Sequence, residues 1–347
     1  NFGDNGACVG YLLGNRCAGM KQMFHMMNEA RIMIGVQCMA LAAIAYEKSL
    51  EYAGQRLQGT DIEHMKDPRA PKVPIVTHPD VRRMLLTQKA YVEAMRGMLY
   101  TTAMWEDLAR YASTDEEKAK YRSFVELMTP VCKSWCSDIG FKSCDLGMQV
   151  LGGYGYTSEY PLEQFVRDAR IGPIYEGTNG IQAMDFVGRK LPANNMANFS
   201  AFIKEIINFA QANAGNRALA DGCNRLRVAA NQVSEAGMRL MTAALRDVPF
   251  LFSHAYTMQD AFGEVVGGWM LLQQAAVASA RLDALYAEKG VTLDTDKAAL
   301  VADNPDAKFY FGKVKTAEFY CKTILPFVAA RLEIIKSGDH AAVEMVF

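Results

Sequence analysis

The stretch from Met20 to about Leu57 constrains the fold more than any other part of this sequence. Its middle, Ile32–Ile44, is apolar on almost every face of a helix, and a helix of this kind is buried on all sides. At 1.5 Å per residue the whole helix would be about 57 Å long. Other long helices must surround it, so the pattern predicts an all-α protein.

Four main helices and one short helix are predicted before residue 191, and together they are expected to form an antiparallel bundle over residues 20–190. Gly59–Pro79 holds four prolines and is predicted to be a loop. The helices that follow the Met20 helix are predicted at Asp80–Ala112, from Thr114 to about Leu151, at Leu162–Ala169 (the short one) and from Thr178 to Lys190.

The segment Leu191–Asn198 is polar, contains a proline and lacks helical periodicity, so we expect it to be a linker between domains. Residues 199–347 are predicted to form a second helical domain, and His254 within it is predicted to be a cap or a surface residue. We expect this domain to be structural, covering the bundle or forming an assembly contact. Its helices are predicted at Phe199–Ala214, about Arg217–Leu245, His254–Lys289 and Asp306–Lys336.

The N-terminal residues are unlike the rest of the chain. Ala7–Leu13 suits a single β-strand, but an isolated strand has no ladder partner and is not stable. Since the sequence also starts without Met, residues 1–19 are predicted to be the short β remnant of a preceding domain.

Composition excludes several classes of protein. The net charge of −1 gives no electrostatic reason to bind nucleic acid or an anionic membrane. No stretch reaches about 18 uninterrupted apolar residues, so no membrane span is expected. The eight scattered cysteines indicate reduced thiols in a cytoplasmic protein. Cys132 and Cys136 are predicted to pack in the core and not to bind metal.

The segment Ile171–Gln182 reads IGPIYEGTNGIQ and places Glu176 in a turn between two helices. Thr178 is a suitable N-cap for the second helix, and Gly177 lets another molecule approach the backbone. Taken alone, a glutamate in a turn is typical of a surface residue. The alternative is a carboxylate held near a helix N-terminus for chemistry.

Three blocks in one order favour that alternative. They are MNEARIMIGVQCMALAAIAYEKSLEYAGQRLQG (27–59), QVLGGYGYTSEYPLEQFVRDARI (149–171) and IYEGT (174–178). In these blocks the chain resembles the C-terminal domain of acyl-CoA dehydrogenases. Residues after 198 resemble the extra helical extension of a larger subgroup, which includes 3-methylmercaptopropionyl-CoA dehydrogenases. The family's N-terminal helical domain and middle β-domain would precede the present sequence.

The resemblance implies an FAD-dependent α,β-dehydrogenation of an acyl-CoA thioester. Glu176 matches the family's base, which removes the α-proton while FAD accepts a hydride from the β-carbon. Asn28, Arg31 and Gly177 match substrate-side positions. From the residues alone, an ion pair within the bundle is the favoured role for Arg31, because an unpaired buried charge is costly.

The resemblance also implies two sets of FAD contacts. Thr178 and Gly180 match positions that touch FAD in their own subunit. Arg56, Gln149, Leu151, Gly152 and Gly153 match positions that hold the FAD of a neighbouring subunit, with the Arg56 guanidinium suited to phosphate. Two positions depart from the family pattern: Gln58 replaces an aromatic residue, and Asn28 stands where an Asp is common.

Shared FAD sites imply at least a homodimer or a dimer of dimers, and the resemblance makes an electron-transfer flavoprotein the expected electron acceptor. Two other functions stay open. The chain could be a non-catalytic helical assembly module derived from this family, or part of an acyl-CoA oxidase.

Overall fold

The computed structural model describes the backbone of residues 1–347 and every side chain except that of His25. As predicted, the protein is built almost entirely from helices. The first half contains α1 (Gly19–Gln55), α2 (Pro79–Tyr111), α3 (Asp115–Leu151), α4 (Leu162–Arg170) and α5 (Asn179–Asp185). The second half contains α6 (Ala197–Ala212), α7 (Ala220–Ala244), α8 (Val248–Ser253), α9 (Ala255–Glu288), α10 (Asp294–Asp303), α11 (Pro305–Thr323), α12 (Phe327–Ser337) and α13 (Ala341–Glu344).

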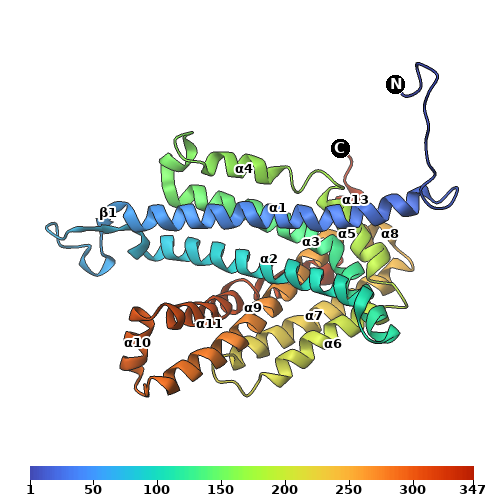
Figure 1. Ribbon diagram of the computed structural model, residues 1–347. Helices are drawn as coiled ribbons and strands as arrows, with labels where there is room; N and C mark the ends of the chain where they lie inside the picture. Colours follow the sequence, from blue (N-terminus) through green and yellow to red (C-terminus); the bar gives the residue numbers. More distant parts are fainter.

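The helices form two layers (Figure 1). The three long helices α1, α2 and α3 lie side by side in one layer, with α4 along their outer face. Helices α6, α7, α9 and α11 form the other layer, and α9 packs on α2. The expectation that helix α1 is buried on all sides is wrong. It packs against α2 and α3, and Ile34, Cys38 and Ala42 are buried. Met33 and Ile44, however, are 60% and 44% exposed.

The fourth main helix predicted for the bundle begins after Thr178 and ends at Lys190 as expected, but only its first part is α-helical. Helix α5 ends at Asp185, and a π-helical turn, Phe186–Lys190, completes the segment. The long helix that covers α2 from the other layer is α9, which belongs to the second half of the sequence. Leu191, at the start of the proposed linker, is fully buried in a core that both halves share.

The predicted strand at Ala7–Leu13 is also wrong. This segment has no regular structure, and Tyr11 in it is 93% exposed. A strand needs a hydrogen-bonded neighbour, and the two strands of the described residues pair with each other. They are β1 (Leu57–Thr60) and β2 (Lys72–Pro74), which form an antiparallel ladder at the base of the predicted Gly59–Pro79 loop.

Several local predictions are confirmed. Thr114 caps α3 in a capping box with Glu117, and both Cys132 and Cys136 are fully buried. His254 does begin a helix, but it is only 5% exposed, so the predicted surface position is wrong. Its ring Nδ1 lies 3.0 Å from the Phe250 carbonyl oxygen, which satisfies the nitrogen without solvent.

Helix α1 bears on the expectation that no segment spans a membrane. By length and composition it is apolar enough to cross a membrane, and 44% of its most apolar window is buried inside the structure. The core helix of a soluble protein has the same properties, so this finding alone does not indicate a membrane protein.

Candidate active site

The Glu176 turn connects α4 to α5 in an uncommon backbone conformation. Glu176 has φ of 54° and Gly177 has φ of 81°, so two successive residues are left-handed. Thr178 ends the turn as the predicted N-cap, with its Oγ1 accepting a hydrogen bond from the Ile181 N–H at 3.3 Å. The side chain of Glu176 is exposed. The turn therefore presents an exposed carboxylate at the start of a helix.

Arg31 lies beneath this turn and is 3% exposed. Its Nη1 lies 3.4 Å from Asp185 Oδ2 and 3.3 Å from Asn28 Oδ1. Asp185 also accepts a hydrogen bond from Arg189 Nε at 2.6 Å. Burial lowers the pKa of the Arg31 guanidinium, and the Asp185 and Glu176 carboxylates oppose that change. The ion pair expected for Arg31 is confirmed, and its partner is Asp185.

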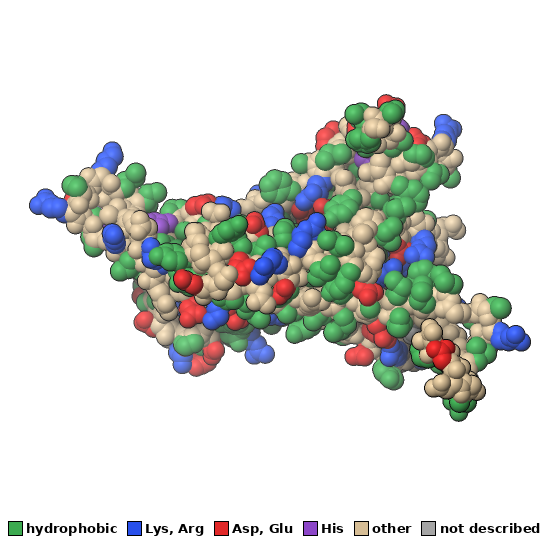
Figure 2. All heavy atoms as spheres, turned by 90° about the horizontal axis from the view of Figure 1, so that it is seen from above, with side chains coloured by type: hydrophobic (Ala, Val, Ile, Leu, Met, Phe, Trp, Pro, Cys, Tyr) green, Lys and Arg blue, Asp and Glu red, His purple; other side chains and the backbone are tan. Residues whose placement is uncertain are grey.

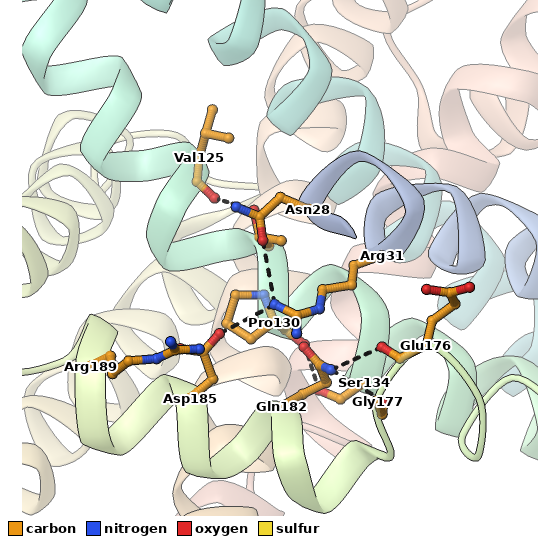
Figure 3. Close-up of polar contacts among 11 residues, drawn as sticks. Asn28, Arg31, Val125, Pro130, Ser134, Glu176, Gly177, Gln182, Asp185 and Arg189 are labelled. Carbon is orange, nitrogen blue, oxygen red and sulfur yellow. Dashed lines mark hydrogen bonds and ion pairs between the residues drawn. The ribbon is translucent and has the colours of Figure 1, made fainter. Parts of the chain in front are cut away.

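Gln182 connects α5 to the turn, and the sequence did not single it out. Its side chain is fully buried. Its Nε2 lies 3.2 Å from the Gly177 carbonyl oxygen and 3.4 Å from the Glu176 carbonyl oxygen. Figure 3 shows the amide between α5 and the turn, next to the Arg31 guanidinium. In the sequence, Gln182 is marked only by its position one helical turn after the N-cap Thr178. That position does not predict a hydrogen bond to the Glu176 and Gly177 carbonyl oxygens.

A second buried network holds the first residue of α5. Asn179 Oδ1 accepts a hydrogen bond from Lys133 Nζ at 2.7 Å, and Asn179 Nδ2 donates to the Ser134 carbonyl oxygen at 3.1 Å. Lys133 is fully buried, and burial lowers its pKa to about 8. The Asn179 side chain thus points into the protein. Gly180, beside it, is exposed, so of this pair only Gly180 is open to a ligand.

The predicted residues of the second FAD set lie together in a groove of about 540 Å³ at the other end of α1. Arg56 caps α1 and is exposed, with its guanidinium 5.3 Å from the centre of the Tyr154 ring. Leu151 is 4% exposed, so its side chain belongs to the core and only its backbone can face a ligand. The groove is lined by Tyr52, Arg56, Gln58, Ile75, Gln149, Val150, Leu151, Gly152, Gly153, Tyr154 and Thr157.

The two sets of residues are far apart within one chain. Arg31 lies in the first half of α1 and Arg56 caps its end, so they are 25 positions apart. At 1.5 Å per residue this is about 37 Å along the helix. The structure thus brings together Glu176, Gly177, Arg31 and Asn28 at one end, and Arg56 with Gln149–Gly153 at the other.

The sequence matches two family models in succession. Residues 59–191 match "Acyl-CoA dehydrogenase, C-terminal domain", and residues 202–346 match "Acetyl-CoA dehydrogenase C-terminal like". The first match ends at Leu191, where the proposed linker begins.

Curated proteins and a solved structure show similarity over nearly the whole chain. A broad-specificity linear acyl-CoA dehydrogenase, FadE5 of Mycobacterium tuberculosis, is 36% identical over 99% of this chain and 55% of its own length. A 3-methylmercaptopropionyl-CoA dehydrogenase of Ruegeria pomeroyi is 32% identical over 95% of this chain and 53% of its own length. The chain spans about half the length of these relatives.

The fold itself is shared with a solved structure. The crystal structure of an acyl-CoA dehydrogenase from Bacillus anthracis, complexed with FAD, has a TM-score of 0.70 and 20% identity. The similarity covers 96% of this chain and 52% of that one.

Proposed function

Because this chain belongs to the acyl-CoA dehydrogenase family, we propose that it carries the proton-abstracting part of an FAD-dependent acyl-CoA dehydrogenase, with Glu176 as the base. The Glu176 turn supports this proposal more than any other feature. In this turn the backbone of Glu176 and of the following glycine is left-handed, and the Glu176 residue lies just before the N-terminus of α5. Such strained backbone in a non-glycine residue is concentrated at functional sites.

In the proposed reaction the Glu176 carboxylate takes the α-proton of an acyl-CoA thioester. The backbone N–H of the same residue donates a hydrogen bond to the thioester carbonyl oxygen, where negative charge builds as the proton leaves. FAD, when bound, supplies the hydride acceptor for the β-carbon. Gly177 carries no side chain that would keep the thioester away from this backbone.

The groove around Arg56 fits the nucleotide part of FAD. An exposed guanidinium suits a pyrophosphate, and Tyr154 offers an aromatic face beside it. A Cβ atom added to Gly152 or Gly153 would meet no other atom within 4 Å, so both glycines leave an open edge for a ligand. The residues present are therefore suited to this cofactor.

The distance between the two sets of residues supports shared sites. An FAD molecule held at Thr178 and Gly180, next to Arg31, is shorter than the roughly 37 Å along α1 from Arg31 to Arg56 of the same chain. We therefore propose a homodimer, or a dimer of dimers, in which Arg56 serves the FAD of the partner. By the same family relationship, an electron-transfer flavoprotein is the proposed electron acceptor and the cytoplasm the proposed location.

Exposed hydrophobic side chains lie in the Glu176 turn and in the helix after it. Figure 2 shows hydrophobic side chains gathered over the half of this face nearer the N-terminal tail, while the Lys and Arg side chains of the β1–β2 loop project at the opposite end. The exposed hydrophobic residues are Ile174 in the turn and Ile181 and Met184 in α5. Burial of such side chains under an acyl chain, or under a further part of the protein, would be favourable.

The test uses the full-length protein with FAD bound. It is mixed without oxygen with 3-methylthiopropionyl-CoA and, separately, with palmitoyl-CoA, and flavin bleaching is followed. We expect bleaching in the wild-type protein and a loss of about 100- to 10,000-fold in its rate in Glu176→Gln, because general bases contribute about that much. The faster substrate identifies the acyl class.

Three other results would change the assignment. Equal bleaching of both forms would show that Glu176 is not the base. No bleaching of FAD-bound wild-type protein would favour the assembly module. Rapid peroxide formation without an added electron acceptor would identify an acyl-CoA oxidase.

A further inference from the structure

We propose that Gln182 is a positioning residue for the Glu176 base, and that its side-chain amide holds the Glu176–Gly177 segment in the left-handed conformation. This inference rests on the proposed function. It adds a requirement that the base assignment alone does not contain, namely a specific hydrogen-bond donor beneath the turn.

The contact geometry supports this role. Gln182 Nε2 is within hydrogen-bond distance of two successive carbonyl oxygens, 3.4 Å from that of Glu176 and 3.2 Å from that of Gly177. The two carbonyl groups belong to the two residues with positive φ. One amide group therefore contacts both residues with positive φ (Figure 3).

The amide also fills the space under Gly177. A Cβ atom added to Gly177 would lie 2.8 Å from Gln182 Nε2 and 3.9 Å from Arg31 Nη2. The turn thus rests directly on the amide, and the Arg31 guanidinium lies beside it. Gln182 is held in turn by α5, whose N-cap is Thr178.

A glutamine at position 182 lowers the stability of the fold, which argues that it is there to position the Glu176 turn. Gln182 Oε1 is buried and has no hydrogen-bond partner among the described residues, and a buried unpaired amide oxygen destabilises a protein. A methionine of similar length would avoid this cost. What methionine cannot supply is the N–H donor to the two carbonyl groups.

Loss of the donor is expected to affect chemistry more than binding. Without it, the non-glycine residue Glu176 can relax toward the preferred negative φ. Such a rotation moves its carboxylate and its N–H together, and both must be aligned for proton abstraction. The FAD groove around Arg56 lies at the other end of α1 and is unaffected.

The experiment compares Gln182→Met with Gln88→Met in the full-length, FAD-bound protein. Gln88 is a matched control because it is also fully buried, and its Nε2 bonds the Met84 carbonyl oxygen far from the turn. The probe is whichever of palmitoyl-CoA and 3-methylthiopropionyl-CoA reduces the wild-type flavin faster, used with hydrogen or deuterium at the α-carbon.

For Gln182→Met we expect at least a 10-fold slower flavin reduction, a larger α-deuterium isotope effect, and FAD content and substrate half-saturation within about 2-fold of wild type. Gln88→Met should keep the wild-type rate and isotope effect. Gln182→Asn is a milder second variant, because it keeps an amide but is one methylene shorter. It should show the same changes to a smaller degree.

The outcomes separate the two proposals. Unchanged reduction in Glu176→Gln would overturn the proposed function and this inference with it. If Glu176→Gln is inactive but either folded Gln182 variant reduces flavin at the wild-type rate, this inference alone is overturned. Equal losses in the Gln182 and Gln88 variants would also overturn it, because they would indicate general destabilisation.

Discussion

Glu176 combines an exposed side chain with a left-handed backbone, and the combination has an energetic cost. For an L-residue other than glycine, the left-handed region is unfavourable by about 1–2 kcal/mol. Gly177, the next residue, has no such penalty. A glycine at position 176 would relieve the strain but would remove the carboxylate, so the sequence keeps a strained residue at its proposed base.

We therefore predict that Glu176→Gly is more stable than Glu176→Ala by about 1 kcal/mol, while both are inactive. In an ordinary helix or strand the order is reversed, since glycine is usually less stable than alanine by about 0.5–1 kcal/mol. Urea unfolding of the two variants, with a common slope, measures the difference. An alanine variant equal to or more stable than the glycine variant would show that φ at this position is not positive in solution.

At this scale the sequence could predict positions that follow from a local motif. Thr178 is the N-cap of α5, Glu176 lies in the turn before it, and Arg56 lies at the end of α1. It could not predict residues that act through burial and distant partners. Arg31 and Asp185 are 154 positions apart, and Lys133 and Asn179 are 46 positions apart. Neither pairing follows from a local pattern.

At the scale of elements, periodicity predicted the long helices well because each one buries an apolar face. Two predictions of elements were wrong, each for a different reason. The helix predicted at Asp306–Lys336 is two helices, α11 and α12, because Pro326 lacks an N–H and interrupts the ladder between them. The strand predicted at Ala7–Leu13 failed because strand formation depends on a neighbour that the segment itself cannot supply.

Glycines of α9 determine how closely it crosses α3. Gly263 and Gly267 both face Trp135, a fully buried side chain of α3. A Cβ atom added to Gly263 would lie 2.6 Å from Trp135 Cγ, which is closer than real contacts allow. Gly268, one residue further along, is less crowded, since its added Cβ would lie 3.4 Å from the nearest atom, in Tyr320.

This contrast predicts opposite effects for two identical substitutions. Gly263→Ala should destabilise the protein by about 1–3 kcal/mol, because Trp135 and the helix must move apart. Gly268→Ala should be neutral or stabilising by up to about 1 kcal/mol, because alanine favours a helix over glycine. Thermal and urea unfolding of both variants provide the test. Similar losses in the two would contradict the close α3–α9 crossing.

At the scale of the whole molecule, the two halves of the sequence share one hydrophobic core. Phe262 of α9 lies at the junction. Its ring centre is 5.1 Å from that of Phe186, at the end of the α5 segment, and 5.5 Å from that of Phe202 in α6. The second half therefore packs against the segment that positions the Glu176 turn.

We predict that Phe262→Ala lowers the stability of the whole chain by about 3–5 kcal/mol and that unfolding stays a single transition. A shared core couples both halves, so neither should unfold before the other. The measurement is thermal unfolding followed by circular dichroism and by tryptophan fluorescence. Two separated transitions, with only one shifted by the substitution, would contradict a common core.

The length of α1 has a consequence for dimers formed from two different mutant chains. The helix carries Arg31 near one end and Arg56 at the other, so each shared site would take one end from each of two chains. Consider a dimer of one chain that lacks the Glu176 carboxylate and one chain that lacks the Arg56 guanidinium. One of its two sites would combine the intact Glu176 of the second chain with the intact Arg56 of the first. The other site would lack both groups. Activity in a mixed population would therefore follow the statistics of pairing, and two separately inactive genes could restore function to each other.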